Sequence, residues 1–239
     1  MNAQTAALLV DLNRQFYQTF AGAFSSTRRR LQPGVRKVLE TLIGDESILD
    51  LGCGNGELAR ALSRRGHRGA YTGLDFSLSL LEDAQAQPGD FPATFIASDL
   101  TSPEWDRALV GSLFTLVTAF AFLHHIPGME TRRRILLQVH ALLLPGGRFI
   151  HSEWQFLNSD KLKDRIQPWG EVGLGPDDVD PGDALLDWRH GGRGLRYVHQ
   201  FDQAELEALA AASGFKIQTT FLSDGENKRL GLYQLWSKE

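Results

Sequence analysis

The residues best suited to chemistry lie in one short stretch, residues 47–61, with the sequence SILDLGCGNGELARA. An acid, Asp50, is followed by three glycines at alternate positions, Gly52, Gly54 and Gly56. Glycine is needed where the backbone takes a positive φ or where a ligand lies directly against it. The helical pattern that follows would add unpaired backbone N–H groups at its first turn. We therefore expect a ligand-binding turn between a buried strand and a helix.

The spacing of the glycines distinguishes between two kinds of ligand. A dinucleotide-binding turn has the pattern G-x-G-x-x-G and holds a pyrophosphate at the helix N-terminus. Here the pattern is D-x-G-x-G-x-G, and Asp50 would repel a pyrophosphate. An acid at this place suits a ligand that has an ammonium group and no phosphate, such as S-adenosylmethionine (SAM). A dinucleotide-dependent oxidoreductase is therefore a distant alternative.

A second acid, Asp75, follows a predicted strand at 69–74 and lies 19 residues beyond Gly56. An acid about 20 residues after such a turn accepts hydrogen bonds from ribose hydroxyls. The alternative is that Asp75 caps the next helix, predicted at 77–86. Of the two we favour the ribose contact. A third acid, Asp99, ends the predicted strand at 93–98.

Two adjacent histidines, His124 and His125, follow an almost wholly apolar strand at 114–120. One interpretation is that one of them lines the transfer site as a hydrogen-bond donor or weak base. The alternative is that one caps the next helix, predicted at 131–143, and the other is packed. We do not expect a metal site, because adjacent histidines point apart and no third ligand is evident.

These residues imply the elements that must position them. Strands separated by helices at this interval predict an α/β fold with a doubly wound, seven-stranded, mostly parallel sheet. Ligands in such sheets bind outside the carboxyl ends of the strands. Four candidate residues fall at such ends, namely Asp50, Asp75, Asp99 and His124. The agreement of these four positions is stronger evidence for a ligand site than any single motif.

The chain divides into four parts within one predicted domain. Residues 1–46 form an N-terminal helical cap that either packs on the sheet or acts as a lid, with Tyr17 toward the ligand. Residues 47–153 form the SAM-binding core. Residues 154–195 form an irregular, aromatic and acidic insertion after a fifth predicted strand that starts at 149–152, and we interpret it as a substrate cover rather than a plain surface loop. Residues 196–239 complete the same sheet.

Composition limits the remaining possibilities. The 239 residues carry a net charge of -4, so the chain as a whole is not a basic nucleic-acid binder. It has no apolar run long enough for a membrane span and no signal-peptide pattern at its start. A single cysteine, Cys53, fits a reducing compartment, so we expect a cytoplasmic protein that does not contact membranes.

The glycine turn, the strand at 114–120 and the segment LPGG at 144–147 resemble the class I SAM-dependent methyltransferases. The resemblance implies SAM as cofactor, S-adenosylhomocysteine (SAH) as product and no metal. It also implies that Asp99 bonds the adenine amino group and that Leu100 supplies a backbone N–H. The cofactor contacts we expect are Asp50, Gly52, Cys53, Gly54, Gly56, Asp75, Phe76, Asp99, Leu100, Ala119, Phe120 and Tyr17.

Two further regions, 13–28 and the segments 182–188 and 195–201 taken together, resemble the tRNA wobble-uridine carboxymethyl methyltransferases. That resemblance implies methylation of a carboxymethyl group on a tRNA base. An ionised carboxylate needs no base, but it needs a cationic clamp. The candidates for the clamp are Arg28, Arg196 and His199, and for an acceptor that needs a base they are His124 and His125. Where that family tends to have Arg-Tyr-Tyr-His, this chain has Arg-Tyr-Val-His at 196–199.

Other functions stay open on the sequence. The acidic insertion favours a small metabolite as acceptor, with a weight equal to that of a tRNA base or related carboxylate. A tRNA enzyme with this charge would bind RNA through a helper subunit, because phosphate contacts supply most nucleic-acid affinity. A third possibility is a SAM-binding subunit that stabilises a partner without catalysis.

Overall fold

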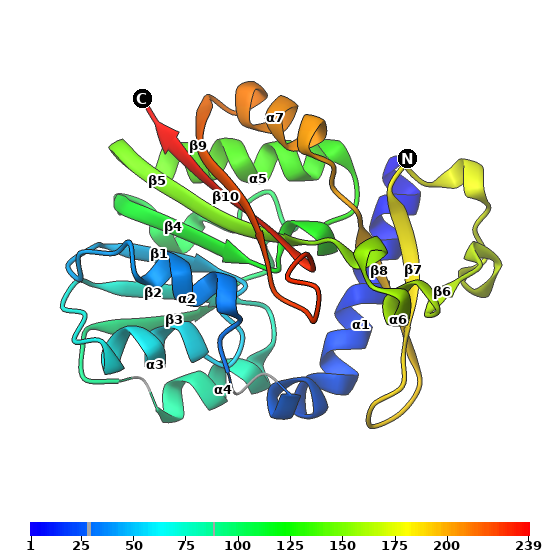
Figure 1. The fold of residues 1–239 in the computed structure, drawn as a ribbon, viewed down its shortest axis with the longest axis horizontal. Helices are drawn as coiled ribbons and strands as arrows, with labels where there is room; N and C mark the ends of the chain where they lie inside the picture. The colour runs from blue at the N-terminus through cyan, green and yellow to red at the C-terminus, as the bar shows by residue number, and fades with distance from the viewer. Residues whose placement is uncertain (28–29, 88) are drawn as a thin grey trace.

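A seven-stranded sheet forms the centre of the computed structural model, which describes residues 1–27, 30–87 and 89–239 (Figure 1). The strand order is β3-β2-β1-β4-β5-β10-β9. Strands β1 to β5 pair in parallel, and β10 pairs antiparallel with both β5 and β9. The strands are β1 (Ile48–Leu51), β2 (Tyr71–Asp75), β3 (Ala93–Ala97), β4 (Phe114–Phe120), β5 (Leu143–Trp154), β9 (Phe215–Ser223) and β10 (Gly231–Lys238). The predicted doubly wound sheet is confirmed.

Helices alternate with the parallel strands. The α-helices are α1 (Ala3–Thr27), α2 (Pro33–Leu39), α3 (Glu57–Arg64), α4 (Leu78–Ala86), α5 (Met129–Leu142), α6 (Asp160–Lys163) and α7 (Gln203–Ala212). Short 3-10 helices are η1 (Arg107–Leu109), η2 (Leu123–His125), η3 (Phe156–Asn158), η4 (Trp169–Val172) and η5 (Pro176–Asp178). In the part of the chain described, no helix is long and apolar enough to cross a membrane.

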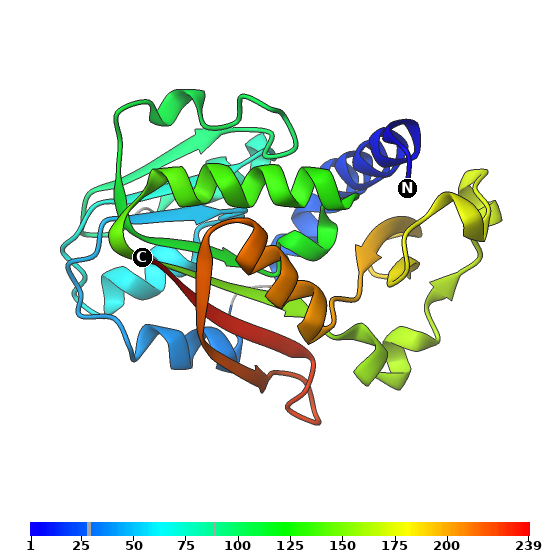
Figure 2. The ribbon, with the colours of Figure 1, turned by 90° about the horizontal axis from the view of Figure 1, so that it is seen from above.

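The side-chain alternation of β1 shows how the sheet is covered on both faces. Leu49 and Leu51 belong to a buried cluster with residues of α5 and α7. Ile48, one position away, belongs to a second cluster with residues of α2 and α3. Successive residues of a strand point to opposite faces, so one apolar strand supplies both cores. Figure 2 accordingly places α5 on one side of the sheet and α2 and α3 on the other.

A second, smaller sheet differs from the expectation for residues 154–239. Strands β6 (Ile166–Gln167), β7 (Asp183–Trp188) and β8 (Gly194–His199) form an antiparallel sheet in the order β6-β7-β8. The insertion is therefore partly regular, and residues 196–199 pair with it instead of with the large sheet. The physical reason is the β7–β8 hairpin, whose loop contains Gly191 and Gly192, both with positive φ.

Helix α1 runs beside β8, close to the carboxyl ends of the large sheet (Figure 1). One side chain, Asn13, joins them. Its Oδ1 accepts a hydrogen bond from the backbone N–H of Tyr197 at 2.8 Å, and its Nδ2 donates to the carbonyl of the same residue at 3.1 Å. The same Nδ2 donates to the carbonyl of His125 at 2.9 Å. Because the amide satisfies the open edge of β8 as another strand would, α1, β8 and η2 are held together.

Candidate functional site

A cavity of about 320 Å³ opens at the carboxyl ends of the parallel strands. It is bounded by α1, the glycine turn after β1, the ends of β2 to β5 and the β9–β10 hairpin. Among the predicted site residues, those on its wall are Tyr17, Asp50, Gly52, Cys53, Gly54, Asp75, Phe76, Asp99, Leu100, Phe120 and His125. The fold thus brings most of the predicted cofactor residues to one place.

The three glycines of the turn have different surroundings. All have positive φ, which favours glycine at each position. A Cβ on Gly54 would meet nothing within 4 Å, so this glycine leaves open space beside the cavity. A Cβ on Gly56 would lie 2.8 Å from the Cβ of Ala84, so this glycine lets α3 pack closely on α4. Gly56 is absent from the cavity wall and acts on it only through the position of α3.

Asp50 is a buried acid without a cationic partner among the contacts that surround it. Its two oxygens accept hydrogen bonds from the Tyr71 hydroxyl at 2.6 Å and the Thr118 hydroxyl at 2.7 Å. Burial raises the pKa of Asp50 to about 6, although both hydrogen bonds oppose the shift. A ligand that brings a positive charge next to this carboxyl would favour its ionised form.

Asp75 ties two loops together at the end of β2. One oxygen accepts a hydrogen bond from the backbone N–H of Gly54, and the other accepts from that of Ser77, both at 2.9 Å. Burial raises the pKa of Asp75, against the effect of these hydrogen bonds. The carboxyl therefore contacts the start of the next helix and also lies on the cavity wall, so both predicted positions are compatible.

Asp99 is held by α1. Oδ1 accepts hydrogen bonds from the N–H and hydroxyl of Thr101 at 2.9 and 2.6 Å, and Oδ2 accepts from Arg14 at 2.7 Å. Burial raises the pKa of Asp99, but these contacts outweigh it, so the pKa lies below its ordinary value. Arg14 is not among the site residues expected from the sequence. Its spacing of three residues from Tyr17, on the same helix face, is the signal that could have indicated it.

The two adjacent histidines have different places. His125 lies on the cavity wall, where its Nε2 is 2.8 Å from the Tyr17 hydroxyl. His124 is fully buried, and its ring stacks on Trp154 with 5.4 Å between centroids. The Nδ1 of His124 lies 2.8 Å from Oε2 of Glu153. Only His125 is therefore placed to meet a ligand directly.

The remaining predicted site residues lie away from the cavity. Ala119 is buried in the core of the sheet. Arg196 is 2% exposed, and its guanidinium lies over the rings of Trp154 and two other aromatic residues. His199 is also buried and contacts Asp183 at 2.6 Å and Glu205 at 2.8 Å. The predicted Arg28 lies outside the described residues. Neither Arg196 nor His199 presents a charge to the cavity wall.

Glu153, a further acid that the sequence patterns did not single out, lines the cavity at the end of β5. Its carboxyl lies between the Nδ1 atoms of His124, at 2.8 Å, and His151, at 3.0 Å. Burial raises the pKa of Glu153 well above its ordinary value and lowers that of His151 to about 3. Glu153 comes one residue after the predicted start of this strand, 149–152, and the pattern does not define where the strand ends. The rule that polar residues lie at strand ends is the signal that could have indicated this acid.

The charges on the wall indicate the class of ligand. Apart from Arg14 and Arg30, the charged residues lining the cavity are acids: Asp50, Glu57, Asp75, Asp99, Glu153 and Asp224. Such a wall disfavours phosphate and suits a cationic ligand with hydroxyl and amino groups. Within the described residues, no three His, Cys, Asp or Glu side chains are grouped as a metal would need.

Comparison with known proteins gives a family match over most of the chain. A family model for the methyltransferase domain matches residues 24–220. A protein of Encephalitozoon cuniculi assigned as a methyltransferase is 29% identical over 204 residues, which cover 85% of this chain and 86% of that protein. The tRNA (carboxymethyluridine) methyltransferase of Macaca fascicularis is 30% identical over 153 residues, 62% of this chain but only 21% of that protein. A carboxy-S-adenosyl-L-methionine synthase of Shewanella halifaxensis is 28% identical over 167 residues, 64% of this chain and 65% of the synthase.

Solved structures share the fold. A SAM-dependent methyltransferase from Methanosarcina mazei superimposes with a TM-score of 0.66 at 23% identity, covering 87% of this chain and 98% of that one. The magnesium protoporphyrin IX methyltransferase of Synechocystis, solved with bound SAH, superimposes with a TM-score of 0.58 at 19% identity. The superposition covers 96% of this chain and 86% of the Synechocystis chain.

Proposed function

This chain belongs to the methyltransferase domain family and is a SAM-dependent methyltransferase, and from that premise we propose that it methylates a small acceptor group inside the cavity. The observation that carries the proposal is the acid-lined cavity at the carboxyl ends of β1 to β5, with the glycine turn on one wall. The reaction needs both ligands in one water-excluding space, because it depends mainly on placing the nucleophile in line with the methyl group.

The residues of the cavity fit SAM. Asp75 would accept hydrogen bonds from the ribose hydroxyls, as an acid at the end of the second strand does. Asp99 would accept one from the adenine amino group, and the region of Asp50 and Gly54 would hold the ammonium end. When bound, SAM supplies a methyl group on a positively charged sulfonium. The acidic wall would stabilise that charge and would repel a phosphate-bearing cofactor.

The acceptor end of the cavity favours a protic acceptor, one that gives up an O–H or N–H proton. There, His125, Tyr17 and Trp154 of β5 lie on the wall, with 6.0 Å between the ring centroids of His125 and Trp154. A carboxylate acceptor would instead need a cation on the wall. The Arg196 guanidinium is enclosed by aromatic rings, and of the two arginines on the wall Arg14 is paired with Asp99, which leaves Arg30. This geometry gives the small-acceptor proposal more support than the carboxylate one.

A tRNA base or related carboxylate is the second candidate. The macaque relative is named for carboxymethyluridine in tRNA, although the alignment covers about a fifth of its length. Arg30, on the cavity wall, is a cation that an acceptor carboxylate could reach. A helper subunit would supply the RNA contacts that this chain's net charge of -4 disfavours.

The test uses SAM labelled on its methyl group, with the purified protein and a cell extract divided into RNA, protein and small-molecule fractions. We expect label in the small-molecule fraction. If the label is found in RNA and mild alkali releases it as methanol, the product is an ester, and the second candidate would replace our proposal.

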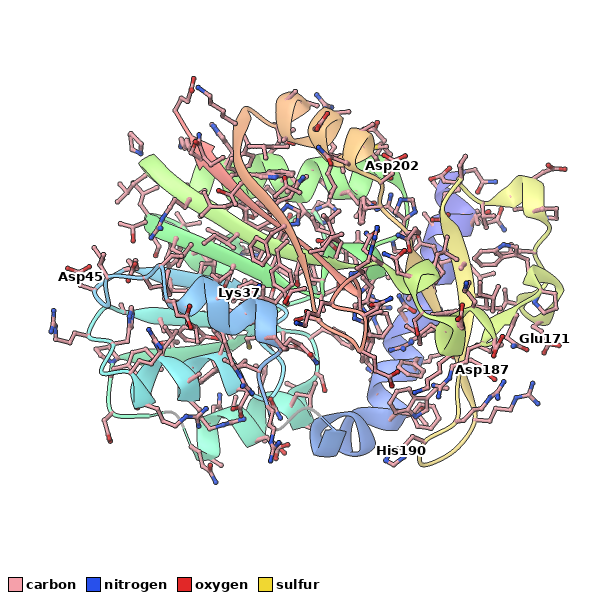
Figure 3. The ribbon with its side chains drawn as sticks, in the orientation of Figure 1. Lys37, Asp45, Glu171, Asp187, His190 and Asp202 are labelled. Atoms are coloured by element: carbon pink, nitrogen blue, oxygen red, sulfur yellow. The ribbon has the colours of Figure 1, made fainter. Side chains whose placement is uncertain are left out.

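An Asp75→Ala variant is expected to lose SAM binding and labelling together. Asp45→Ala is the matched control, because Asp45 is exposed at the opposite end of the sheet (Figure 3). SAM binding without label in any fraction would favour a non-catalytic subunit.

A further inference from the structure

We propose that Tyr17 receives the proton that the acceptor loses, and that Arg196 is a positioning residue that acts through Tyr17. The inference rests on the proposed function and deepens it, because it restricts the acceptor to groups that carry an O–H or N–H proton. It also gives the buried arginine a role other than binding a carboxylate directly.

The hydrogen bonds around Tyr17 determine which group its hydroxyl donates to. Tyr17 and His125 both line the cavity, and the phenol oxygen is 2.8 Å from Nε2 of His125. The other ring nitrogen, Nδ1, lies 3.4 Å from the carbonyl oxygen of Tyr197. A carbonyl can only accept, so in the neutral ring Nδ1 carries the hydrogen and Nε2 is left to accept. The Tyr17 hydroxyl therefore donates to His125, and its own oxygen can accept a hydrogen bond from the cavity.

Behind Tyr17 lies a guanidinium with an incomplete set of partners. The carbon of the Arg196 guanidinium is 4.6 Å from the ring of Trp154, 5.4 Å from that of Phe16 and 5.5 Å from that of Trp188. Its Nε and Nη1 are buried and have no hydrogen-bond partner in the described part of the chain. Burial lowers the pKa of Arg196, and its hydrogen bond and charge interaction with Tyr17 oppose that shift. A buried positive charge next to a phenol favours the phenolate as the hydroxyl gives up its proton.

The three groups are held in a fixed arrangement. Asn13, one turn before Tyr17 on α1, bonds the carbonyl of His125 and both backbone groups of Tyr197. Tyr197 is next to Arg196 in β8, so one amide fixes the helix that carries the phenol, the imidazole and the strand that carries the guanidinium. Positioning to within a fraction of an ångström is what proton transfer requires.

The proposed step conserves atoms, electrons and charge. The acceptor's O–H or N–H proton passes to the Tyr17 oxygen while the Tyr17 proton passes to Nε2 of His125, which becomes an imidazolium. The acceptor atom forms its bond to the methyl carbon, and the carbon–sulfur bond breaks with its electron pair going to sulfur. No oxidant or further reactant is needed. Arg196 stabilises the negative charge that the tyrosine oxygen carries during the exchange.

A titration of the tyrosines tests the Arg196–Tyr17 relation without any acceptor. The chain has four tyrosines, and burial raises the pKa of Tyr71, Tyr197 and Tyr233 above the ordinary value. Absorbance at 295 nm should therefore show one tyrosine ionising at lower pH than the rest. This first ionisation phase should be missing in Tyr17→Phe and should move to higher pH in Arg196→Met.

Other titratable or charged groups also share the cavity with Tyr17, namely Arg14, Arg30, Asp50, Cys53, Glu57, Asp75, Asp99, His125, Glu153 and Asp224.

The controls separate the arginine's charge from its packing. Arg196→Lys keeps a positive charge and should leave the phase nearer its original pH than Arg196→Met does. Arg193→Met, in the loop of the same β7–β8 hairpin, should leave it unchanged because Arg193 is exposed. Figure 3 marks this hairpin by Asp187 and His190. An Arg196→Met titration identical to wild type, in a protein with native circular dichroism, would overturn the proposal.

Methyl transfer supplies the second test, with the acceptor fraction identified by the labelling experiment. Tyr17→Phe should lower kcat about 100-fold or more and leave the dissociation constant for SAM within about twofold. Arg196→Met should lower kcat while the KM for SAM stays constant. A parallel loss of SAM affinity in Tyr17→Phe would make Tyr17 a cofactor contact and contradict the proposal. If wild type transfers no methyl group, the proposed function fails, and the tyrosine titration still decides the relation between Arg196 and Tyr17.

Discussion

The two ends of the cavity are built in different ways. The cofactor end is formed by the turn after β1 and the ends of β2 and β3, where backbone groups or hydroxyls hold each acid and only Asp99 has a further contact, with Arg14 of α1. The acceptor end is formed by α1, η2 and the end of β5, with β8 packed behind them, and these elements are far apart in the sequence. The cofactor end can be predicted from one strand at a time, whereas the acceptor end forms only when segments that are distant in the sequence pack together.

The largest effect should come from removing the central acid of the cofactor end. Asp75→Ala would leave the N–H groups of Gly54 and Ser77 without their buried acceptor and would remove the proposed ribose contact. We expect SAM binding to weaken at least about 100-fold, since a charged hydrogen bond contributes about 1.5–3 kcal/mol and two others are lost with it. Calorimetric titration with SAM measures this. Affinity equal to wild type would remove Asp75 from the proposed cofactor site.

A change at Gly56 should disturb the cofactor end through packing alone. Alanine there would place a Cβ 2.8 Å from that of Ala84 and would have to adopt a φ of 78°. We expect the free energy of unfolding to fall by about 2 kcal/mol, with about 1 kcal/mol from left-handed strain at a non-glycine residue and about 1 kcal/mol from overpacking against Ala84. Urea denaturation of Gly56→Ala against Gly66→Ala provides the comparison. Gly66 also has positive φ, but a Cβ there would meet nothing within 4 Å, so the variant isolates the effect of φ.

Asn13→Ala should affect the acceptor end alone. It would leave the carbonyls of His125 and Tyr197 and one N–H without the amide that joins them. We expect a loss of about 1–3 kcal/mol in unfolding free energy and a lower kcat, with SAM affinity close to wild type. Thermal unfolding and SAM titration on the same sample test this. A larger effect on SAM affinity than on kcat would contradict the division into two ends.

The smallest effect should be a pH dependence that arises at Asp50. The pKa of about 6 in the folded protein lies above the ordinary value of 3.8. The stability that this raised pKa contributes is present in full below pH 3.8 and is lost as pH rises through about 6. A cationic ligand should reverse part of that loss, so SAM should bind several-fold more tightly at about pH 7 than at about pH 5. Asp50→Asn should lack this change in affinity.

The same contrast explains how far the sequence could be used. The strands of the large sheet and the acids at their ends follow from local patterns, namely apolar runs, a glycine turn and an acid after each strand. The β7–β8 hairpin and the burial of Arg196 could not be predicted, because they depend on which strand β8 pairs with and on Asn13 closing its edge. His199 likewise contacts Asp183 and Glu205, from another strand and another helix, which no local spacing indicates.

The only cysteine of the chain lies in the glycine turn, on the cavity wall. Its neighbours are close: a Cβ on Gly73 would lie 2.9 Å from the Cys53 sulfur. Burial raises the pKa of the Cys53 thiol well above its ordinary value, so alkylating reagents will modify it only when the turn opens. The protein therefore carries its own reporter of cofactor-site opening. The alkylation rate of unmodified protein, followed by mass spectrometry with and without ligand, gives the frequency of that opening without any introduced label.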